Sequence, residues 1–459
     1  MAERYAAVRR RTAAQDRASI TLNSNRRAFQ SALPRARVVP TPAWYESLLF
    51  VALMSGPPKF RVRDMNASLS GDIDSVVLVH LAVWACGAVW VLRQLYPTLF
   101  RSATIPRLSA VQFVGAVFIA ELCVSIPRAP GPMLTAFVLS QFAILLAFAA
   151  VFVGRFGVST YFKHMFAGVF VLVLMVCLAV VTMPDLVLAG GMGRFRGDLF
   201  VGPGGLGVIG LVLCLSNTPQ LKWYLFWPMI ALSGLLLAAS QTRTCYVALI
   251  AYLVIGAVCG RGLRVRKLVP LLGAIVIGLL LFDELSPASE YVIRDRSTLE
   301  TMSDRGPLWD FLIDQVMREQ PLTGLGYFSA SRILAPMHNS SLGDAHSSFL
   351  EVIVGGGLLG AGLFLALCLM LLATAARVLL VGPNRAQAVS AVGLLSATLV
   401  MGFTSSSALH GGPVGFTFWS TTALLPALLA QRSPRAATRT AILRPRKARP
   451  VDRRSMASP

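Results

Sequence analysis

Arginine and histidine residues recur in the polar segments of a chain that is otherwise mostly apolar. Arg305 opens "RGPLWDFLIDQVM", Arg243 lies in "LAASQTRTCYV", Arg194 and Arg196 lie in "GGMGRFRGDLF", and His346 directly precedes an apolar run. Guanidinium groups bind the oxygens of a diphosphate in pairs, and a neutral imidazole can accept a proton from a hydroxyl group. Together these residue types suit displacement at a carbon atom that carries a diphosphate leaving group.

The composition indicates that these residues are carried by a membrane protein. The chain has 459 residues, of which 55% are hydrophobic and 14% are charged, whereas a soluble protein has about 25% charged residues. Apolar runs recur at lengths of about 17–25 residues, which is enough for a helix to cross the hydrocarbon core. The strands of a membrane barrel would instead be about ten residues long and alternate in polarity. The predicted fold class is therefore all-α, a polytopic bundle of transmembrane helices.

Twelve apolar runs are candidates for transmembrane helices. The first and sixth are short, so either could be tilted or re-entrant, and the tenth is long enough to extend beyond the bilayer. The runs lie near residues 43–56, 75–92, 108–126, 132–153, 165–183, 205–216, 223–240, 245–259, 268–282, 347–376, 388–404 and 413–430.

The distribution of basic residues predicts which side of the membrane each loop occupies. An even number of spans puts both termini on one side, and with both termini in the cytoplasm 30 of the 42 Lys and Arg residues are cytoplasmic. The tails at 1–38 and 431–459 hold 18 of these residues, and four more lie in "GRGLRVRKL". This bias agrees with the rule that cytoplasmic loops are enriched in Lys and Arg. The long polar segment 283–346, with ten acidic residues, is then outside.

This topology divides the chain into five parts. Basic cytoplasmic tails occupy 1–38 and 431–459, the first nine transmembrane helices occupy 39–282, a periplasmic loop occupies 283–346, and the last three helices occupy 347–430. Within the loop, Ser303 or Asp304 can cap a short helix. We expect that helix to lie against the membrane surface, because its apolar residues share one face. These residues are Leu308, Trp309, Leu312, Ile313, Val316 and Met317.

The net charge of +21 does not indicate a nucleic-acid partner. Most of the excess lies in the two tails, and basic tails on a polytopic protein more often meet the anionic headgroups of membrane lipids. The seven Cys residues lie in or beside apolar runs and form no C-x-x-C pair. They are interpreted as small core residues rather than as disulfides or metal ligands.

Each arginine or histidine alone has a simpler interpretation. An arginine at a membrane interface commonly extends its guanidinium group to water, and an isolated histidine there is more often structural. His338 and His410 are further histidines on the predicted outer side. Arginine is disfavoured on that side, yet Arg194, Arg196, Arg243 and Arg305 all fall there. The whole set, rather than any one residue, therefore indicates a site.

The last third of the chain resembles the superfamily of O-antigen ligases and bacterial polysaccharide polymerases. In that family an Arg is followed closely by Trp and by P-x-x-G-x-G, and later by a His, a Leu four residues on, and G-x-x-G. "SQTR" resembles the family's S-x-S-R, with Thr242 in place of the second Ser. "RFRGDLFVGPGG" resembles its Arg–Gly–Pro-Asn loop, with Gly204 in place of Asn. Ser347 replaces the Asn that commonly follows the family's His. The matching positions are Arg305, Trp309, Pro321, Gly324, Gly326, His346, Leu350, Gly357 and Gly360.

The resemblance implies a metal-independent glycosyltransferase of the bacterial inner membrane that uses no cofactor. Its donor would be a glycan on undecaprenyl diphosphate, transferred with inversion to an acceptor hydroxyl at the outer face of the membrane. By the same resemblance the implied roles are catalysis for His346 and Arg305, diphosphate binding for Arg194, Arg196 and Arg243, and support of the loop for Trp309, Gly324 and Gly326.

Three alternatives stay open at this point. If the acceptor is another lipid-linked repeat unit, the enzyme is a polymerase of exopolysaccharide or O-antigen. If the acceptor is a lipid A core sugar, the enzyme is a ligase. The departures from the family pattern favour the polymerase. A transporter or flippase would more often carry charges near the membrane midplane, where Glu121 alone lies well inside a run. A metal-dependent glycosyltransferase could use Asp72 and Asp74 in "SGDIDS", although an isolated D-x-D is common in solvated loops.

Overall fold

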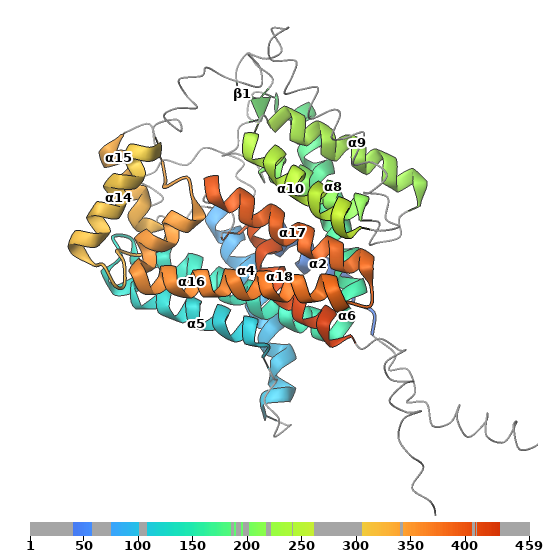
Figure 1. Cartoon of the computed structure of the whole chain (residues 1–459), viewed down its shortest axis with the longest axis horizontal. Coiled ribbons are helices and arrows are strands. Elements are labelled where there is room, and N and C mark those ends of the chain that lie inside the picture. Colours follow the sequence, from blue (N-terminus) through green and yellow to red (C-terminus); the bar gives the residue numbers. More distant parts are fainter. Residues whose placement is uncertain are drawn as a thin grey trace, which may run out of the picture. The chain divides into compact units, whose positions relative to one another are not determined.

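The computed structural model describes a chain of helices. Apart from one 3-10 helix and one two-stranded pair, the regular elements of the described residues are α-helices, which confirms the all-α fold class (Figure 1). The helices belong to a unit formed by residues 42–459, and only Pro40 and Thr41 are described of the separate unit 1–41. The described residues are 40–56, 75–100, 108–184, 188–189, 194–195, 202–216, 222–240, 242–260, 305–339, 343–405, 409 and 411–431.

The helices follow the predicted apolar runs closely, and the run near 268–282 lies outside the described residues. Among the described helices, seven are long and apolar enough to cross a membrane, and α2, α8 and α10 are shorter. The elements are α2 (Trp44–Ser55), α4 (Ser75–Phe100), α5 (Ala110–Val124), η1 (Ile126–Arg128), α6 (Pro132–Thr182), β1 (Leu188–Ala189), β2 (Arg194–Phe195), α8 (Pro203–Leu215), α9 (Trp223–Ser240), α10 (Arg243–Cys259), α14 (Arg305–Glu319), α15 (Ser329–His338), α16 (Ser348–Val381), α17 (Arg385–Thr404) and α18 (Pro413–Ala430).

Helix α6 combines two of the predicted runs. It has 51 residues, so it would be about 75 Å long if straight, against a hydrocarbon core about 30 Å thick. The backbone leaves the helical conformation at Gly157, where φ is 78° and ψ is 162°. This break lies between the runs 132–153 and 165–183, as expected for two spans that follow each other directly.

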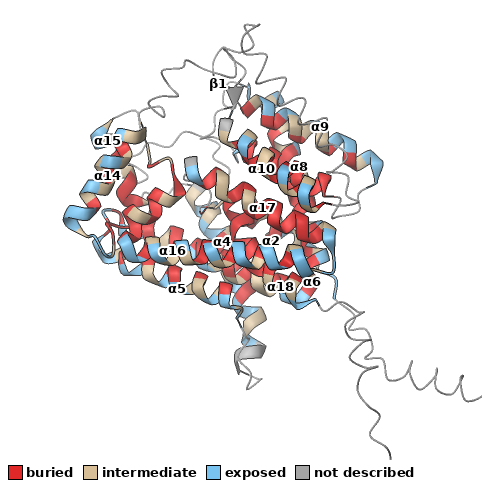
Figure 2. Ribbon diagram, viewed as in Figure 1, coloured by how far each residue is buried: buried red, intermediate tan, exposed pale blue. Residues whose placement is uncertain are grey.

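The core of the bundle is built on the short helix α8 and on α18. Every residue of α8 from Pro203 to Leu215 is buried, and α8 packs against α6, α9 and α17 (Figure 2). Helix α18 packs against α6, α16 and α17, with Trp419 fully buried. Helices α4 and α9 instead leave large apolar side chains exposed, among them Leu78 and Trp227. An apolar exterior of this kind suits contact with lipid rather than with water.

The helix predicted near residue 305 is present as α14, but its apolar face has a different partner from the one expected. Leu308, Leu312 and Val316 are fully buried and cluster with side chains of α15 and of the first turns of α16. Met317, by contrast, is 38% exposed. The expectation that this face lies on the membrane surface is therefore wrong, because protein covers it. The proposed caps Ser303 and Asp304 lie outside the described residues.

Candidate active site

His346 lies in a tight turn directly before α16. The carboxylate oxygen Oδ1 of Asp344 accepts a hydrogen bond of 2.6 Å from the backbone N–H of His346, so Asp344 bonds the backbone two residues ahead of itself. His346 adopts a left-handed backbone conformation with φ at 52°. The hydroxyl group of Ser347 then caps α16 by accepting from the N–H of Leu350 at 3.4 Å. Ser and Asn are comparable caps, so the departure from the family pattern at 347 leaves this function intact.

Arg305 and Trp309 connect α14 to this turn. They are four residues apart, so they share one face of the helix. The indole Nε1 of Trp309 donates to the carbonyl oxygen of Ala345 at 3.0 Å. Burial lowers the pKa of the Arg305 guanidinium, while the negative charge of Asp344 acts in the opposite direction. The spacing of Arg and Trp in the sequence therefore has a structural meaning, because both residues act on the segment that carries His346.

Gly324 and Gly326 lie in a turn that fills a break in α16. The helix leaves its regular conformation at Gly357, and the turn supplies hydrogen bonds there: Leu325 N–H donates to Val354 O, and Leu358 N–H donates to Pro321 O, both at 2.8 Å. Gly324 has φ at 68°, and a Cβ atom on it would lie 2.5 Å from the backbone of Gly355. The backbone of this turn therefore packs directly against the break in α16.

Helix α6 anchors the same loop to the bundle. The hydroxyl oxygen of Thr135 lies 2.9 Å from the carbonyl oxygen of Tyr327, to which it donates, and 2.8 Å from the hydroxyl oxygen of Ser329. Nearby, Arg128 donates from Nη1 to the hydroxyl group of Thr323 at 3.0 Å. The segment 323–329, which includes the start of α15, is consequently held against η1 and α6 by contacts between residues distant in the sequence.

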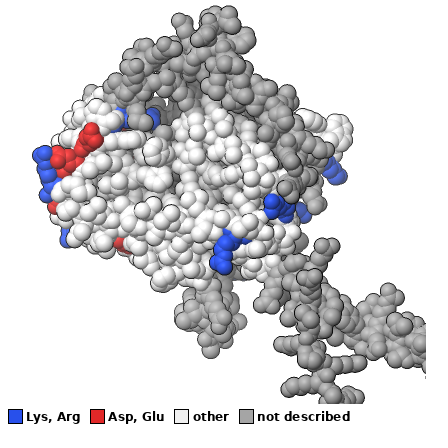
Figure 3. All heavy atoms as spheres, viewed as in Figure 1, with Lys and Arg blue, Asp and Glu red and all other residues white. Residues whose placement is uncertain are grey.

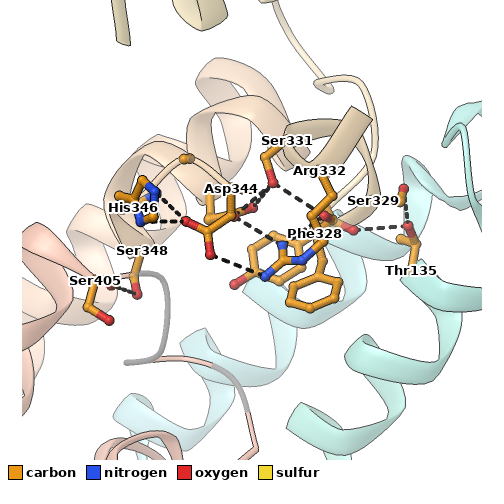
Figure 4. A network of polar contacts seen from close by, with 12 residues as sticks. Thr135, Phe328, Ser329, Ser331, Arg332, Asp344, His346, Ser348 and Ser405 are labelled. Atoms are coloured by element: carbon orange, nitrogen blue, oxygen red, sulfur yellow. Dashed lines mark hydrogen bonds and ion pairs between the residues drawn. The ribbon is translucent and has the colours of Figure 1, made fainter. Parts of the chain in front are cut away.

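A buried polar network continues from Asp344 into α15 and α16 (Figure 4). Arg332 extends Nη2 toward Asp344 Oδ2 at 3.6 Å and donates from Nη1 to Glu351 Oε1 at 3.3 Å. Glu351 is fully buried and also accepts from the hydroxyl group of Ser331 at 2.8 Å. Arg332 is not among the predicted site residues, because it belongs to no motif; its one signal in the sequence is its place near the polar His346 segment.

The three arginines predicted to bind diphosphate are described less fully. Arg194 lies in β2, where it is the register partner of Ala189, and Arg243 is the first residue of α10, but the side chains of these arginines are outside the description. Arg196 lies outside the described residues altogether.

The packing of α10 against α17 nevertheless shows where Arg243 begins its helix. Two residues on, Cys245 Sγ lies 3.9 Å from Met401 Sδ near the end of α17. Ser405, which follows α17, accepts a hydrogen bond of 2.8 Å from the hydroxyl group of Ser348 at the start of α16. Arg243 therefore starts α10 at the same end of the bundle at which His346 precedes α16.

The exposed surface of α14 is charged. Asp310, Asp314 and Glu319 are exposed on this helix together with Arg318, and Figure 3 shows acidic side chains beside basic ones at this edge of an otherwise mostly uncharged face. His338 ends α15 on the exposed side, where its ring stacks on Phe311 with centroids 5.1 Å apart. Neither His338 nor His346 is part of a metal-ligand cluster, since the described residues contain no group of three His, Cys, Asp or Glu side chains placed to hold a metal ion.

The remaining candidates fall outside what the structure describes. Asp72 and Asp74, considered as metal ligands, and His410 are in segments without described structure. Of the eight predicted site residues, Trp309 therefore bonds the turn that holds His346, and Arg305 lies within the electrostatic influence of Asp344 in that turn. Gly324 and Gly326 lie in the turn that packs against the break in α16.

Comparison with known families supports the resemblance seen in the sequence. Residues 228–365 match the family model described as O-antigen ligase. The match begins within α9 and ends within α16, so it includes Arg243, the whole of α14 and α15, and His346, whereas Arg194 and Arg196 precede it. No curated protein matches the chain.

Proposed function

We propose that the chain is a glycosyltransferase of the bacterial inner membrane, because residues 228–365 match the family model described as O-antigen ligase. Its donor is a glycan carried by undecaprenyl diphosphate, and its acceptor is a hydroxyl group at the outer face of the membrane. The observation that carries the proposal is the His346 turn, which Trp309 bonds at Ala345 and whose Asp344 acts electrostatically on Arg305, at the end of the bundle where Arg243 begins α10.

The residues of this turn suit an inverting displacement. His346 has a side chain that is 33% exposed, so a substrate hydroxyl group can reach its imidazole and give up its proton there. The hydroxyl oxygen attacks the anomeric carbon, and the bond from that carbon to the diphosphate oxygen breaks. The leaving diphosphate gains negative charge, which the guanidinium groups of Arg305 and Arg243 stabilise. Arg194 and Arg196 are assigned to the same diphosphate.

Two acceptors are compatible with this chemistry. A second lipid-linked glycan makes the enzyme a polymerase of exopolysaccharide or O-antigen, and this is the acceptor that we propose. A lipid A core sugar would make it a ligase, which the description of the matching family favours. The products separate the two: a polymerase yields a ladder of repeat units on the lipid carrier, and a ligase yields glycan attached to the core.

The test is transfer by the purified protein in liposomes that contain the lipid-linked donor and one acceptor at a time. His346→Ala should lower the rate by about 10²–10⁴-fold, because general-base assistance contributes that much. His338→Ala is the matched control and should keep most of the activity, since its ring only stacks on Phe311 at the surface. Parental rates from His346→Ala would show that another group takes the proton, and uptake of glycan without transfer would indicate a transporter.

A further inference from the structure

The Asp344 carboxylate lies between His346 and Arg332 and contacts both (Figure 4). Its Oδ1 atom is 3.0 Å from the imidazole Nδ1 of His346, and its Oδ2 atom is 3.6 Å from Nη2 of Arg332. The side chain of Asp344 is 21% exposed, so it is more enclosed than the imidazole that it holds. An imidazole that is bonded through Nδ1 in this way presents its other nitrogen, Nε2, to a substrate.

Arg332 is itself held firmly. Its Nη1 atom donates to the carbonyl oxygen of Phe328 at 3.0 Å and to Glu351 Oε1 at 3.3 Å, and its guanidinium carbon lies 3.3 Å from the centroid of the Phe328 ring. Glu351 is fully buried, and the Ala345 backbone is a further hydrogen-bond partner of its carboxylate. Arg332, which is largely enclosed, and the buried Glu351 therefore hold Asp344 and the turn around it in place.

We propose that Asp344 is a positioning residue for the transfer reaction, and that Arg332 and Glu351 hold it in place. This inference rests on the proposed function. Asp344 accepts the Nδ1 proton of His346 in a hydrogen bond, which leaves the lone pair of Nε2 to take the proton of the acceptor hydroxyl group. As the hydroxyl oxygen bonds to the anomeric carbon, the electron pair of the old carbon–oxygen bond leaves with the diphosphate. The imidazolium formed at His346 is then stabilised by the negative charge of Asp344.

A role in catalysis must be separated from a role in the turn, because Asp344 Oδ1 also bonds the backbone of His346. Asp344→Asn separates them, since the amide oxygen can still accept from that backbone N–H while the negative charge is lost. We expect kcat for transfer to fall by about 10²–10⁴-fold, the range of general-base assistance. KM for the lipid-linked donor should stay near the parental value, because arginines bind the diphosphate.

The decisive measurement combines the two substitutions. If Asp344 acts through His346, the double variant Asp344→Asn with His346→Ala should be no slower than His346→Ala alone, because residues that act as a unit are not additive. Asp314→Asn is the matched control: Asp314 pairs with Arg318 on the exposed side of α14 and should leave kcat unchanged.

Two results would overturn this inference while leaving the proposed function in place. One is a parental kcat for Asp344→Asn beside a slow His346→Ala variant. The other is a double variant whose loss equals the product of the two single losses. Parental rates from His346→Ala would instead overturn the assignment of the base, and with it the positioning role of Asp344.

Discussion

His346 shows how a single residue can be held in a backbone conformation that its side chain disfavours. Its left-handed backbone, with φ at 52°, costs about 1–2 kcal/mol for a residue that has a Cβ atom. The hydrogen bond from its N–H to Asp344 helps to offset this cost. Strained residues of this kind persist only where their surroundings determine them, and here Trp309 and Glu351 also bond the turn at Ala345.

The sequence led to some residues of the site and not to others. Arg305, Trp309 and His346 follow a family pattern, whereas Asp344 and Glu351, which flank the histidine, are not among the predicted site residues. Arg332 could not be identified, because its contact with Glu351 spans 19 residues and forms only when α15 folds against α16. A polar side chain in a short helix is normally solvated, and nothing in the local sequence distinguishes this one.

The buried pair leads to a prediction about stability. Arg332→Met should lower the free energy of unfolding by up to about 3–5 kcal/mol above pH 7, where Glu351 is ionised, because Glu351 is fully buried and would lose the charge that compensates its own. Burial raises the pKa of Glu351 to about 7, so the loss should be smaller at lower pH, where the carboxyl group is neutral. The measurement is denaturant or thermal unfolding of the purified protein in detergent. Arg318→Met is the same substitution in an exposed pair with Asp314 and should cost less than about 1 kcal/mol. Equal losses from the two variants would mean that the Arg332 pair is not stabilising.

At the scale of the elements, hydrophobic length was a reliable guide and short polar segments were not. The runs near 223–240 and 413–430 coincide with α9 and α18, because a membrane span needs a long apolar stretch that stands out in any sequence. Helix α15 was not predicted, and the apolar face of α14 was assigned to the wrong partner. Both depend on packing against α16, and amphipathicity alone does not say what covers an apolar face.

The break in α16 gives the element-scale prediction. Gly324→Ala should destabilise the loop and slow transfer, because its Cβ would lie 2.5 Å from the Gly355 backbone and its φ of 68° disfavours a side chain. Gly362→Ala is the control in the regular part of α16, where a Cβ meets no atom within 4 Å. That variant should keep its activity and gain up to about 1 kcal/mol of stability. The melting temperature and the transfer rate are measured for both variants. Equal melting temperatures and equal rates would contradict the expected role of Gly324.

At the scale of the whole molecule, the site needs to be on the outer side of the membrane. The bias of Lys and Arg predicts that segment 283–346 lies outside. Helix α16 breaks at Gly357, and its part after the break, residues 358–381, is about 36 Å long, so it can carry the chain across a core of about 30 Å. Its two ends should therefore face different compartments.

Cysteine labelling tests this topology. In a background with the seven native cysteines replaced by Ala, Met337→Cys on α15 should react with an impermeant maleimide in intact spheroplasts, because Met337 is 72% exposed. Pro383→Cys is exposed between α16 and α17, and it should react only after lysis. The two positions lie beyond opposite ends of α16, so each is the control for the other. The reverse pattern would place the His346 turn in the cytoplasm, away from a glycan assembled outside, and the proposed reaction would then have to be abandoned.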